Sequence, residues 1–306
     1  MDLQKIGVKI GHYTDFDNGT GCTVFLFDKP VRASVSVRGS APASRETDLL
    51  RPGKMIREIN GIVLSGGSAY GLESVYGVME FLEEQGKGYD TGAALVPLVP
   101  AASIYDLKFK NSHVRPTKKW GYKAASSANY VLETGTVGAA TGATVGKFLG
   151  IDRASKTRFA FHLENFDEYF VSAFMVVNAL GEIIDEHGNI IAGIREEDKF
   201  IPAYDLIKKI DFRKFRMGEN TTLGVVITNF PLSKEMLSRM AEIGHNGIVR
   251  AVRPSHTPFD GDIIFSVSIS NDRPIDEPYQ LLKLFALTEL TVQRAIIDSA
   301  LVNSVQ

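Results

Sequence analysis

Apolar and polar residues follow a strand-like pattern along several short stretches of the chain. The first three stretches, residues 8–10, 22–27 and 33–37, are rich in β-forming residues and are separated by turn-rich segments. The stretch 33–37 alternates strictly, as expected of a strand with one buried face. The same signals predict further strands over residues 61–65, 170–177 and 223–228, over 263–269, and in a hairpin that pairs 182–185 with 189–193.

Helices are predicted over residues 72–85, 124–132 and 279–301, and from Ser233 onward, where the serine side chain can cap the first turn. In the helix 72–85, apolar residues recur at spacings of three and four, so one face should be buried. The buried face of the helix after Ser233 would consist of Met236, Leu237, Met240, Ala241 and Ile243. Between residues 195 and 219 charged residues dominate, which makes this segment the best candidate for a linker.

Composition adds a cellular setting to this picture. The 306 residues are 44% hydrophobic and 23% charged, which is typical of a soluble globular protein. A net charge of −2 gives no electrostatic reason to expect nucleic acid or an anionic membrane as a partner. The single cysteine, Cys22, fits a reducing compartment. No signal peptide and no apolar run of the ~20 residues that a membrane helix needs is visible, so a cytoplasmic protein is expected.

The junction between Asn220 and Thr221 is the first candidate for chemistry. A polar, charged segment ends at Asn220, and a run of β-formers begins at Thr221. A threonine at the start of a buried strand is where a self-cleaving hydrolase would keep its nucleophile. The alternative is an ordinary loop-to-strand junction, in which threonine is favoured by its β-propensity. Taken alone, this stretch favours the ordinary junction.

Other short motifs in the chain also have a chemical and an ordinary interpretation. The glycines around Ser68 do not form a P-loop, since no Gly-Lys-Ser/Thr follows them. They do not form a nucleophile elbow either, because they stand at 66 and 71 and the elbow needs glycines at 66 and 70. Asp260 and Asp262 occupy alternate positions and would face the same way in an extended segment. They are either a turn with a strand start or a carboxylate pair that orients a nucleophile or an amine. The six histidines are scattered without the spacing of a zinc site.

Three further residues have ordinary interpretations of their own. Tyr105 follows an apolar, proline-rich run and is typical of amphipathic core. Lys147 ends a run of small residues and would by default be a surface lysine with its stem on apolar neighbours. Asn178 stands at a strand end, where asparagine usually forms a turn. The small-residue loop 38–48, which carries both charge signs, is either solvated or a wall of an active site.

Several longer motifs together resemble the L-aminopeptidase/D-esterase–amidase (DmpA-type) family, which includes β-aminopeptidases and endo-type 6-aminohexanoate oligomer hydrolases. The resemblance covers nearly the whole chain. Its motifs are Gly19–Thr23, Arg45–Leu50, Ser65–Leu72, Val96–Ala102, Gly138–Lys147, Val177–Ala179, Asn220–Thr222 and Arg253–Asp262. It implies an α+β fold with a four-layer αββα sandwich, like that of ornithine acetyltransferases and similar to N-terminal-nucleophile hydrolases.

The resemblance also implies roles for particular residues. Asn220–Thr221 corresponds to a self-cleavage bond, and Thr221 to the new N-terminal nucleophile. Tyr105 and Asn178 match residues that help to hold the oxyanion. Lys147, Asp260 and Asp262 match polar residues that orient the nucleophile. Neither a cofactor nor a metal is implied, and relatives are typically homotetramers of processed subunits.

The implied chemistry is coherent. The Thr221 hydroxyl would attack the carbonyl of Asn220, giving an ester that water hydrolyses, and the freed α-amine, with a reference pKa of ~7.7–8.0, could serve as base for its own hydroxyl. A single domain of residues 1–306 would become an α chain, 1–220, and a β chain, 221–306. The expected substrate is a small peptide or amide. An acyltransferase with the same nucleophile, or an unprocessed binding protein, are the alternatives.

Overall fold

A long, bent strand joins the two halves of the protein. The computed structural model describes residues 2–197, 199–209 and 220–300. Strand β2, Thr20–Val37, lies between β1, Val8–Asp15, and β4, Glu58–Ser65, in its first half. From Arg32 onward the edge that β1 occupied pairs with β18, Ile263–Ser268. The predicted separation of strands 22–27 and 33–37 is therefore wrong, because the exposed residues Asp28, Lys29 and Pro30 shift the register of the strand without ending it.

These pairings form one hydrogen-bonded sheet of nine strands, which β2 divides into two parts that pack face to face as the two sheets of the sandwich. One continues from β4 to β7, Ala101–Ser103, and β3, Ala43–Arg45. The other runs from β18 to β16, Thr221–Thr228, then to β11, Tyr169–Asn178, and β10, Ala160–Phe166. The predicted strands 170–177, 223–228 and 263–269 are confirmed within one or two residues. Strand β16, the first element after the predicted cleavage bond, lies between β11 and β18.

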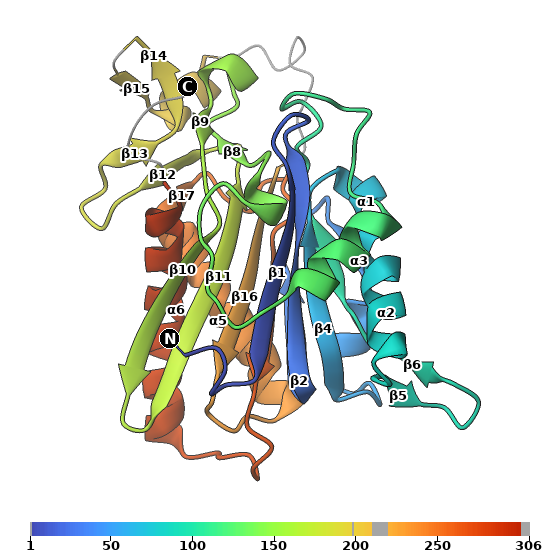
Figure 1. Ribbon diagram of the computed structural model, residues 1–306. Coiled ribbons are helices and arrows are strands. Elements are labelled where there is room, and N and C mark those ends of the chain that lie inside the picture. Colours follow the sequence, from blue (N-terminus) through green and yellow to red (C-terminus); the bar gives the residue numbers. More distant parts are fainter. Residues whose placement is uncertain (1, 198, 210–219, 301–306) are drawn as a thin grey trace.

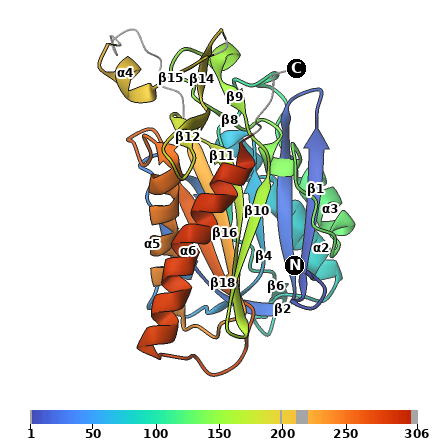
Figure 2. The ribbon, with the colours of Figure 1, turned by 90° about the vertical axis from the view of Figure 1, so that its left-hand side faces the viewer.

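Four layers form because each sheet buries both of its faces (Figures 1 and 2). Helices α2, Ser74–Glu84, and α3, Lys118–Ser127, cover the first sheet, and α5, Lys234–Ala251, and α6, Pro278–Ser299, cover the second. Successive side chains of a strand point to opposite faces. Val225 accordingly packs between the sheets with Phe25 and Phe174, whereas Val226 packs against the helices α5 and α6. The predicted αββα sandwich is confirmed.

The helix predictions were right in kind and less exact in extent. The serine cap of α5 is confirmed, since Ser233 Oγ accepts a hydrogen bond from the amide of Met236 at 3.3 Å. The helix predicted over 124–132 begins six residues earlier and ends five residues earlier, since Asn129 lies outside it and forms a bridge with Ile10 of β1. The helix predicted over 72–85 is α2, preceded by the single turn α1, Ser68–Gly71. The predicted end of α6 at Leu301 lies outside the described residues.

The remaining elements are short and lie mostly at the ends of the sheets. The predicted hairpin is confirmed as β12, Glu182–Ile184, and β13, Ile190–Ala192. Part of the predicted linker is folded, and its stretch 210–219 lies outside the described residues. The others are η1, Asp48–Leu50; β5, Tyr89–Asp90; β6, Leu95–Val96; η2, Gly138–Ala140; β8, Thr144–Val145; η3, Ile151–Arg153; β9, Ser155–Lys156; β14, Ile194–Glu196; β15, Lys199–Ile201; α4, Ala203–Ile207; and β17, Val252–Arg253. Among the described helices, none combines the length and apolarity needed to cross a bilayer.

Candidate active site

Thr221 begins β16 at one end of the inter-sheet core. In the antiparallel pairing with β11, Thr221 lies directly opposite Asn178, the last residue of that strand. Directly opposed residues of an antiparallel pair place their side chains on the same face. Leu223 and Val176, two residues further along each strand, belong to the core between the sheets. Thr221 and Asn178 therefore both face the inter-sheet layer at its end.

The peptide bond before Thr221 has two hydrogen-bond donors on its carbonyl oxygen. Thr221 Oγ1 donates to the oxygen of Asn220 at 2.6 Å, and the amide of Gly261 donates to the same oxygen at 2.7 Å. Asn220 and Thr221 are both buried. Two donors on one carbonyl oxygen polarise the carbonyl and are positioned to stabilise negative charge that develops on it. The predicted nucleophile, the carbonyl group it would attack and a backbone donor to that carbonyl oxygen thus lie together.

Gly261 can approach Thr221 this closely because it has no side chain. A Cβ atom at position 261 would lie 2.9 Å from Thr221 Oγ1 and 2.8 Å from the oxygen of Ala41. The loop before β3 packs against this same turn, since the amide of Ala41 donates to the oxygen of Asp260 at 2.9 Å. The loop 38–48 therefore contacts this turn through Ala41 while residues 40–42 are exposed to solvent, and its role as a wall of the active site stays a prediction.

The two aspartates flank Gly261 and bind different backbone groups. Asp262 Oδ1 accepts the amide of Thr222 at 2.6 Å, and Asp260 Oδ2 accepts the amide of Thr257 at 2.6 Å. Burial, reinforced by the neighbouring charge of Asp262, raises the pKa of Asp260 to about 6. The pair therefore holds the strand that carries Thr221 and keeps one carboxyl group close to its protonation midpoint near neutral pH.

Lys147 points inward, so its interpretation as a surface lysine is wrong. Its amino group donates to both the backbone oxygen and Oδ1 of Asn178, each at 2.8 Å. Burial lowers the pKa of Lys147 to about 7, against the opposing attraction of Asp260. Hydrogen bonds from the amides of Gly146 and Lys147 to the segment 180–181 fix the turn that carries the side chain. The lysine can therefore exchange a proton near neutral pH, directly beside the cross-strand partner of Thr221.

Asn178 connects three parts of the site and does not form a turn with its side chain. Its Oδ1 accepts the amide of Thr144 at 3.2 Å as well as the lysine amine, and its Nδ2 donates to the backbone oxygen of Tyr105 at 2.9 Å. Tyr105 thus joins the group through its main chain. These contacts link the six predicted residues and Asn220 into one cluster at the end of the sandwich. Tyr105 and Lys147 are half-buried and the others are buried. Their catalytic roles remain predictions.

Comparison with known proteins assigns the chain to a family. Residues 3–305 match Peptidase family S58. The chain belongs to this family. The predicted resemblance to the DmpA-type enzymes is thereby confirmed, and the family supports hydrolysis of peptide or amide bonds.

Curated relatives align with most of this chain. An uncharacterized aminopeptidase of Mycobacterium leprae is 35% identical over 283 residues, which span 86% of this chain and 76% of that protein. A 6-aminohexanoate-oligomer endohydrolase of Kocuria sp. is 30% identical over 274 residues, spanning 88% of this chain and 74% of that protein. Both alignments extend over most of the sandwich.

Solved structures share the fold. The L-aminopeptidase D-Ala-esterase/amidase of Ochrobactrum anthropi, described as a variant of the Ntn hydrolase fold, matches with a TM-score of 0.71 at 17% identity and covers 95% of this chain and 83% of its own. A Burkholderia β-aminopeptidase matches with a TM-score of 0.67 at 16% identity, covering 97% and 85%.

The S58 chain has a buried aspartate beside Tyr105 that sequence reasoning did not single out. Asp106 accepts hydrogen bonds from the Thr20 hydroxyl and the Gly67 amide, each at 2.7 Å. A Cβ at Gly66 would lie 2.2 Å from Asp106 Oδ2, so glycine is needed there for packing. Lys156 lies nearby, held by three backbone carbonyls, and burial lowers its pKa to about 7. The Tyr105–Asp106 pair and the glycines after β4 were the available signals.

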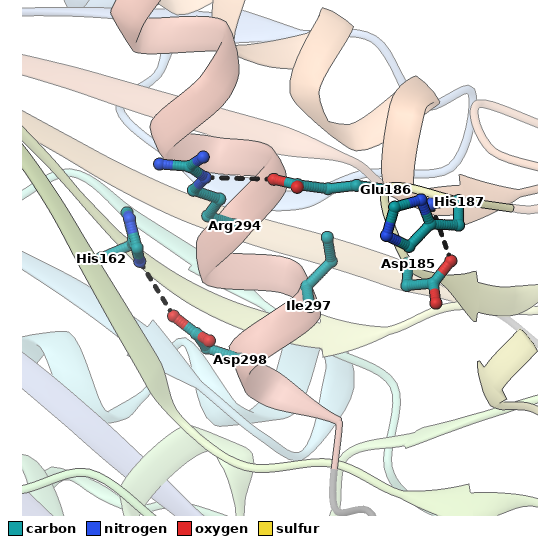
Figure 3. Close-up of a pocket in the computed structure, with 7 residues that line it drawn as sticks. All are labelled: His162, Asp185, Glu186, His187, Arg294, Ile297 and Asp298. Carbon is teal, nitrogen blue, oxygen red and sulfur yellow. Dashed lines mark hydrogen bonds and ion pairs between the residues drawn. The ribbon is translucent and has the colours of Figure 1, made fainter. Parts of the chain in front are cut away.

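A separate cavity of about 390 Å³ lies beside the C-terminal end of α6 and includes none of the predicted site residues (Figure 3). Its charged groups are paired with one another: His162 contacts Asp298 at 3.0 Å, and Arg294 contacts Glu186 at 3.1 Å. In the described part of the chain, no three His, Cys, Asp or Glu side chains converge closely enough to hold a metal ion. The cluster around Thr221 is therefore the stronger candidate for the active site.

Proposed function

We propose that this protein is a self-processing hydrolase of peptide or amide bonds in which Thr221 is the nucleophile. One observation carries the proposal: the Thr221 hydroxyl and the Gly261 amide both contact the carbonyl oxygen of the peptide bond that would be cut. The family and the names of its relatives support the bond type. The specific substrate class we infer is a peptide-like amide, as in the aminopeptidases and the aminohexanoate-oligomer hydrolase to which the chain is similar.

Self-cleavage begins with attack of Thr221 Oγ1 on the carbonyl carbon of Asn220. The C–N bond breaks, the nitrogen gains a proton, and the acyl group moves to the hydroxyl oxygen as an ester. Water then hydrolyses the ester, leaving a carboxylate on Asn220 and a free α-amine and hydroxyl on Thr221. The Gly261 amide stabilises the oxyanion. A preorganised donor of this kind is worth about 2.7–4 kcal/mol in related chemistry.

A different base serves the intact chain, because the nitrogen of Thr221 is then part of an amide. Lys147 and Asp260 are the two groups of the cluster whose pKa values, about 7 and about 6, lie near neutral pH. Groups with such values transfer protons most effectively near pH 7. We infer that they exchange the protons of the first reaction, with Asp262 holding the Thr222 amide in place.

After cleavage the α-amine of Thr221 takes over as base. Successive amides of a strand point to opposite sides, and that of Thr222 points toward β18. The nitrogen of Thr221 therefore points toward β11 and Asn178, whose backbone oxygen also accepts from Lys147. A neighbouring ammonium group lowers the pKa of an amine. Lys147 should thus keep the new α-amine neutral, and able to accept the hydroxyl proton in each turnover.

Self-cleavage also explains how a substrate would reach the nucleophile. Thr221 is 3% exposed and Asn220 is fully buried in the intact chain. Breaking the bond between them frees the end of the α chain to move away from the hydroxyl. The precursor is therefore expected to be inactive toward external substrates until it has cut itself.

Intact mass and a denaturing gel test the proposal. Purified protein should give two fragments that meet at Asn220/Thr221, and Thr221→Ala should stay whole and lose hydrolysis of a peptide, β-peptide, D-amino-acid amide and aminohexanoate panel. Thr221→Ser keeps a hydroxyl and should still process. A protein that remains at full length after long incubation, with wild-type activity in Thr221→Ala, would refute the nucleophile.

A further inference from the structure

His256 is built into the site through Asp262. Its ring Nδ1 lies 2.8 Å from Asp262 Oδ2, and its backbone amide donates to the same oxygen at 3.2 Å. The other oxygen of Asp262 accepts the amide of Thr222. In the tautomer that carries its proton on Nδ1, the ring donates to this carboxylate oxygen. Two groups of His256 therefore contact the same carboxylate oxygen, and the other oxygen accepts a hydrogen bond from the strand that carries Thr221.

The backbone of His256 is held in an uncommon conformation. Its φ is +54°, in the left-handed region that residues with a side chain rarely adopt. Residues held in such strained conformations cluster at functional sites. At this φ, both the ring nitrogen and the backbone amide of His256 reach the same oxygen of Asp262.

A second buried histidine supports the ring from behind. The rings of His245 and His256 meet edge to face, with centroids 4.9 Å apart. Nε2 of His245 contacts the backbone oxygen of Ser36 at 3.0 Å, and burial lowers the pKa of His245 to about 4, so this ring is neutral near pH 7. A neutral ring packed in this way fixes the orientation of His256 without adding charge beside Asp262.

We propose that His256 is a positioning residue, which fixes Asp262 so that the carboxylate holds the Thr222 amide and keeps Thr221 aligned with its target carbonyl. The proposal rests on the proposed function. Losing the ring would let the Asp262 carboxylate rotate, and the hydroxyl of Thr221 would spend less time at its attacking position. A small misplacement of a nucleophile slows a reaction far more than it weakens binding of the substrate.

A matched pair of variants compares a side chain that can donate to Asp262 with one that repels it. Asn and Asp tolerate the left-handed region and have nearly the same size. In His256→Asn, the amide nitrogen can replace Nδ1 as donor, and self-cleavage and kcat should stay within about threefold of wild type. In His256→Asp a carboxylate faces Asp262, and both rates should fall by about tenfold or more, with KM nearly unchanged. His113→Asn, in an exposed loop, is the control for loss of an imidazole.

The outcomes separate this proposal from the proposed function. Equal rates for the Asn and Asp variants, with wild-type self-cleavage and hydrolysis, would overturn the role of His256 alone. Absence of cleavage in the wild type, with activity kept in Thr221→Ala, would overturn the proposed function itself. If His256→Asp does not fold, His256→Gly, which suits the backbone and lacks the donor, should show the same loss relative to His256→Asn. A glycine variant as fast as the asparagine variant would likewise overturn the proposal.

Discussion

Replacing Gly261 with alanine should slow self-cleavage sharply while leaving the sandwich folded. The backbone of Gly261 lies outside the left-handed region, so alanine is conformationally allowed. The added Cβ would meet Thr221 Oγ1 at 2.9 Å, the oxygen of Ala41 at 2.8 Å and Cα of Pro42 at 3.1 Å. The backbone atoms of Ala41 and Pro42 belong to the loop 38–48. The turn 260–262 must therefore move, and the Gly261 amide moves with it.

The magnitude follows from the group that is displaced. The amide donates to the carbonyl oxygen of Asn220 at 2.7 Å, and loss of one oxyanion donor typically reduces a rate by about 10²–10³-fold. Overpacking of this kind costs about 1–3 kcal/mol of stability. The assay is the fraction cleaved against time in freshly purified precursor, measured on a denaturing gel, together with a thermal melt.

Gly53→Ala is the control, because a Cβ there meets nothing within 4 Å and only the backbone is strained. It should process at the wild-type rate. If Gly261→Ala cleaves as fast as wild type and melts at the same temperature, the close contact between Gly261 and the Thr221 hydroxyl has no role in the reaction.

Three other predictions follow from the charged groups. The Lys147 amine has a pKa of about 7 in the folded protein and 10.5 in a model compound. The unfolded chain therefore binds more protons between these values, and the free energy of unfolding should rise as pH increases from 7 to 10. In a urea-unfolding series, Lys147→Met should flatten that rise, and the variant should also cleave itself more slowly. Burial and the charge of Asp262 raise the pKa of Asp260 from 3.8 to about 6, so the folded protein binds more protons between these values and stability should fall as pH rises through them. At pH 8 the carboxyl group is ionised, so Asp260→Asn should melt higher by about 2 °C or more while processing slowly. An unchanged or lower melting temperature would contradict a cost of ionising Asp260. Asp106→Ala leaves the Thr20 hydroxyl and Gly67 amide without their acceptor and should lower the free energy of unfolding by about 2–5 kcal/mol, with a smaller loss in Asp106→Asn.

Much of the fold could be predicted from periodicity, because strands and helices in a four-layer sandwich bury regular faces. The strands 170–177, 223–228 and 263–269 and the capped helix after Ser233 were found in this way. Periodicity failed where tertiary pairing decides. Residues 28–30 have turn-like chemistry, yet they remain within β2 because β4 pairs with β2 on both sides of them. Asn129 left its predicted helix because β1 offers it a partner.

The site could be predicted only through long motifs, since its residues come from five separate parts of the chain. Spacing cannot show that Lys147 turns inward to Asn178, because the acceptors are supplied by a strand 31 residues away. Nor can it show that Gly261 contacts the oxygen of Asn220, or that Asp106 is enclosed by Gly66 and Gly142. The spacing of the histidines excludes a zinc site, but it cannot show that His256 contacts Asp262.

The position of β16 between β11 and β18 determines whether this protein can refold after it unfolds. The precursor forms its sheet as one molecule, with β16 inserted between β11 and β18 while still tethered to the residues before it. Once the bond at Asn220 is cut, the two fragments would have to find each other from solution to rebuild the same sheet. Unfolding of the mature enzyme should therefore be hard to reverse and recovery should depend on concentration, whereas Thr221→Ala should refold at any dilution. Maturation would then exchange a reversible folding equilibrium for stability that rests on slow unfolding.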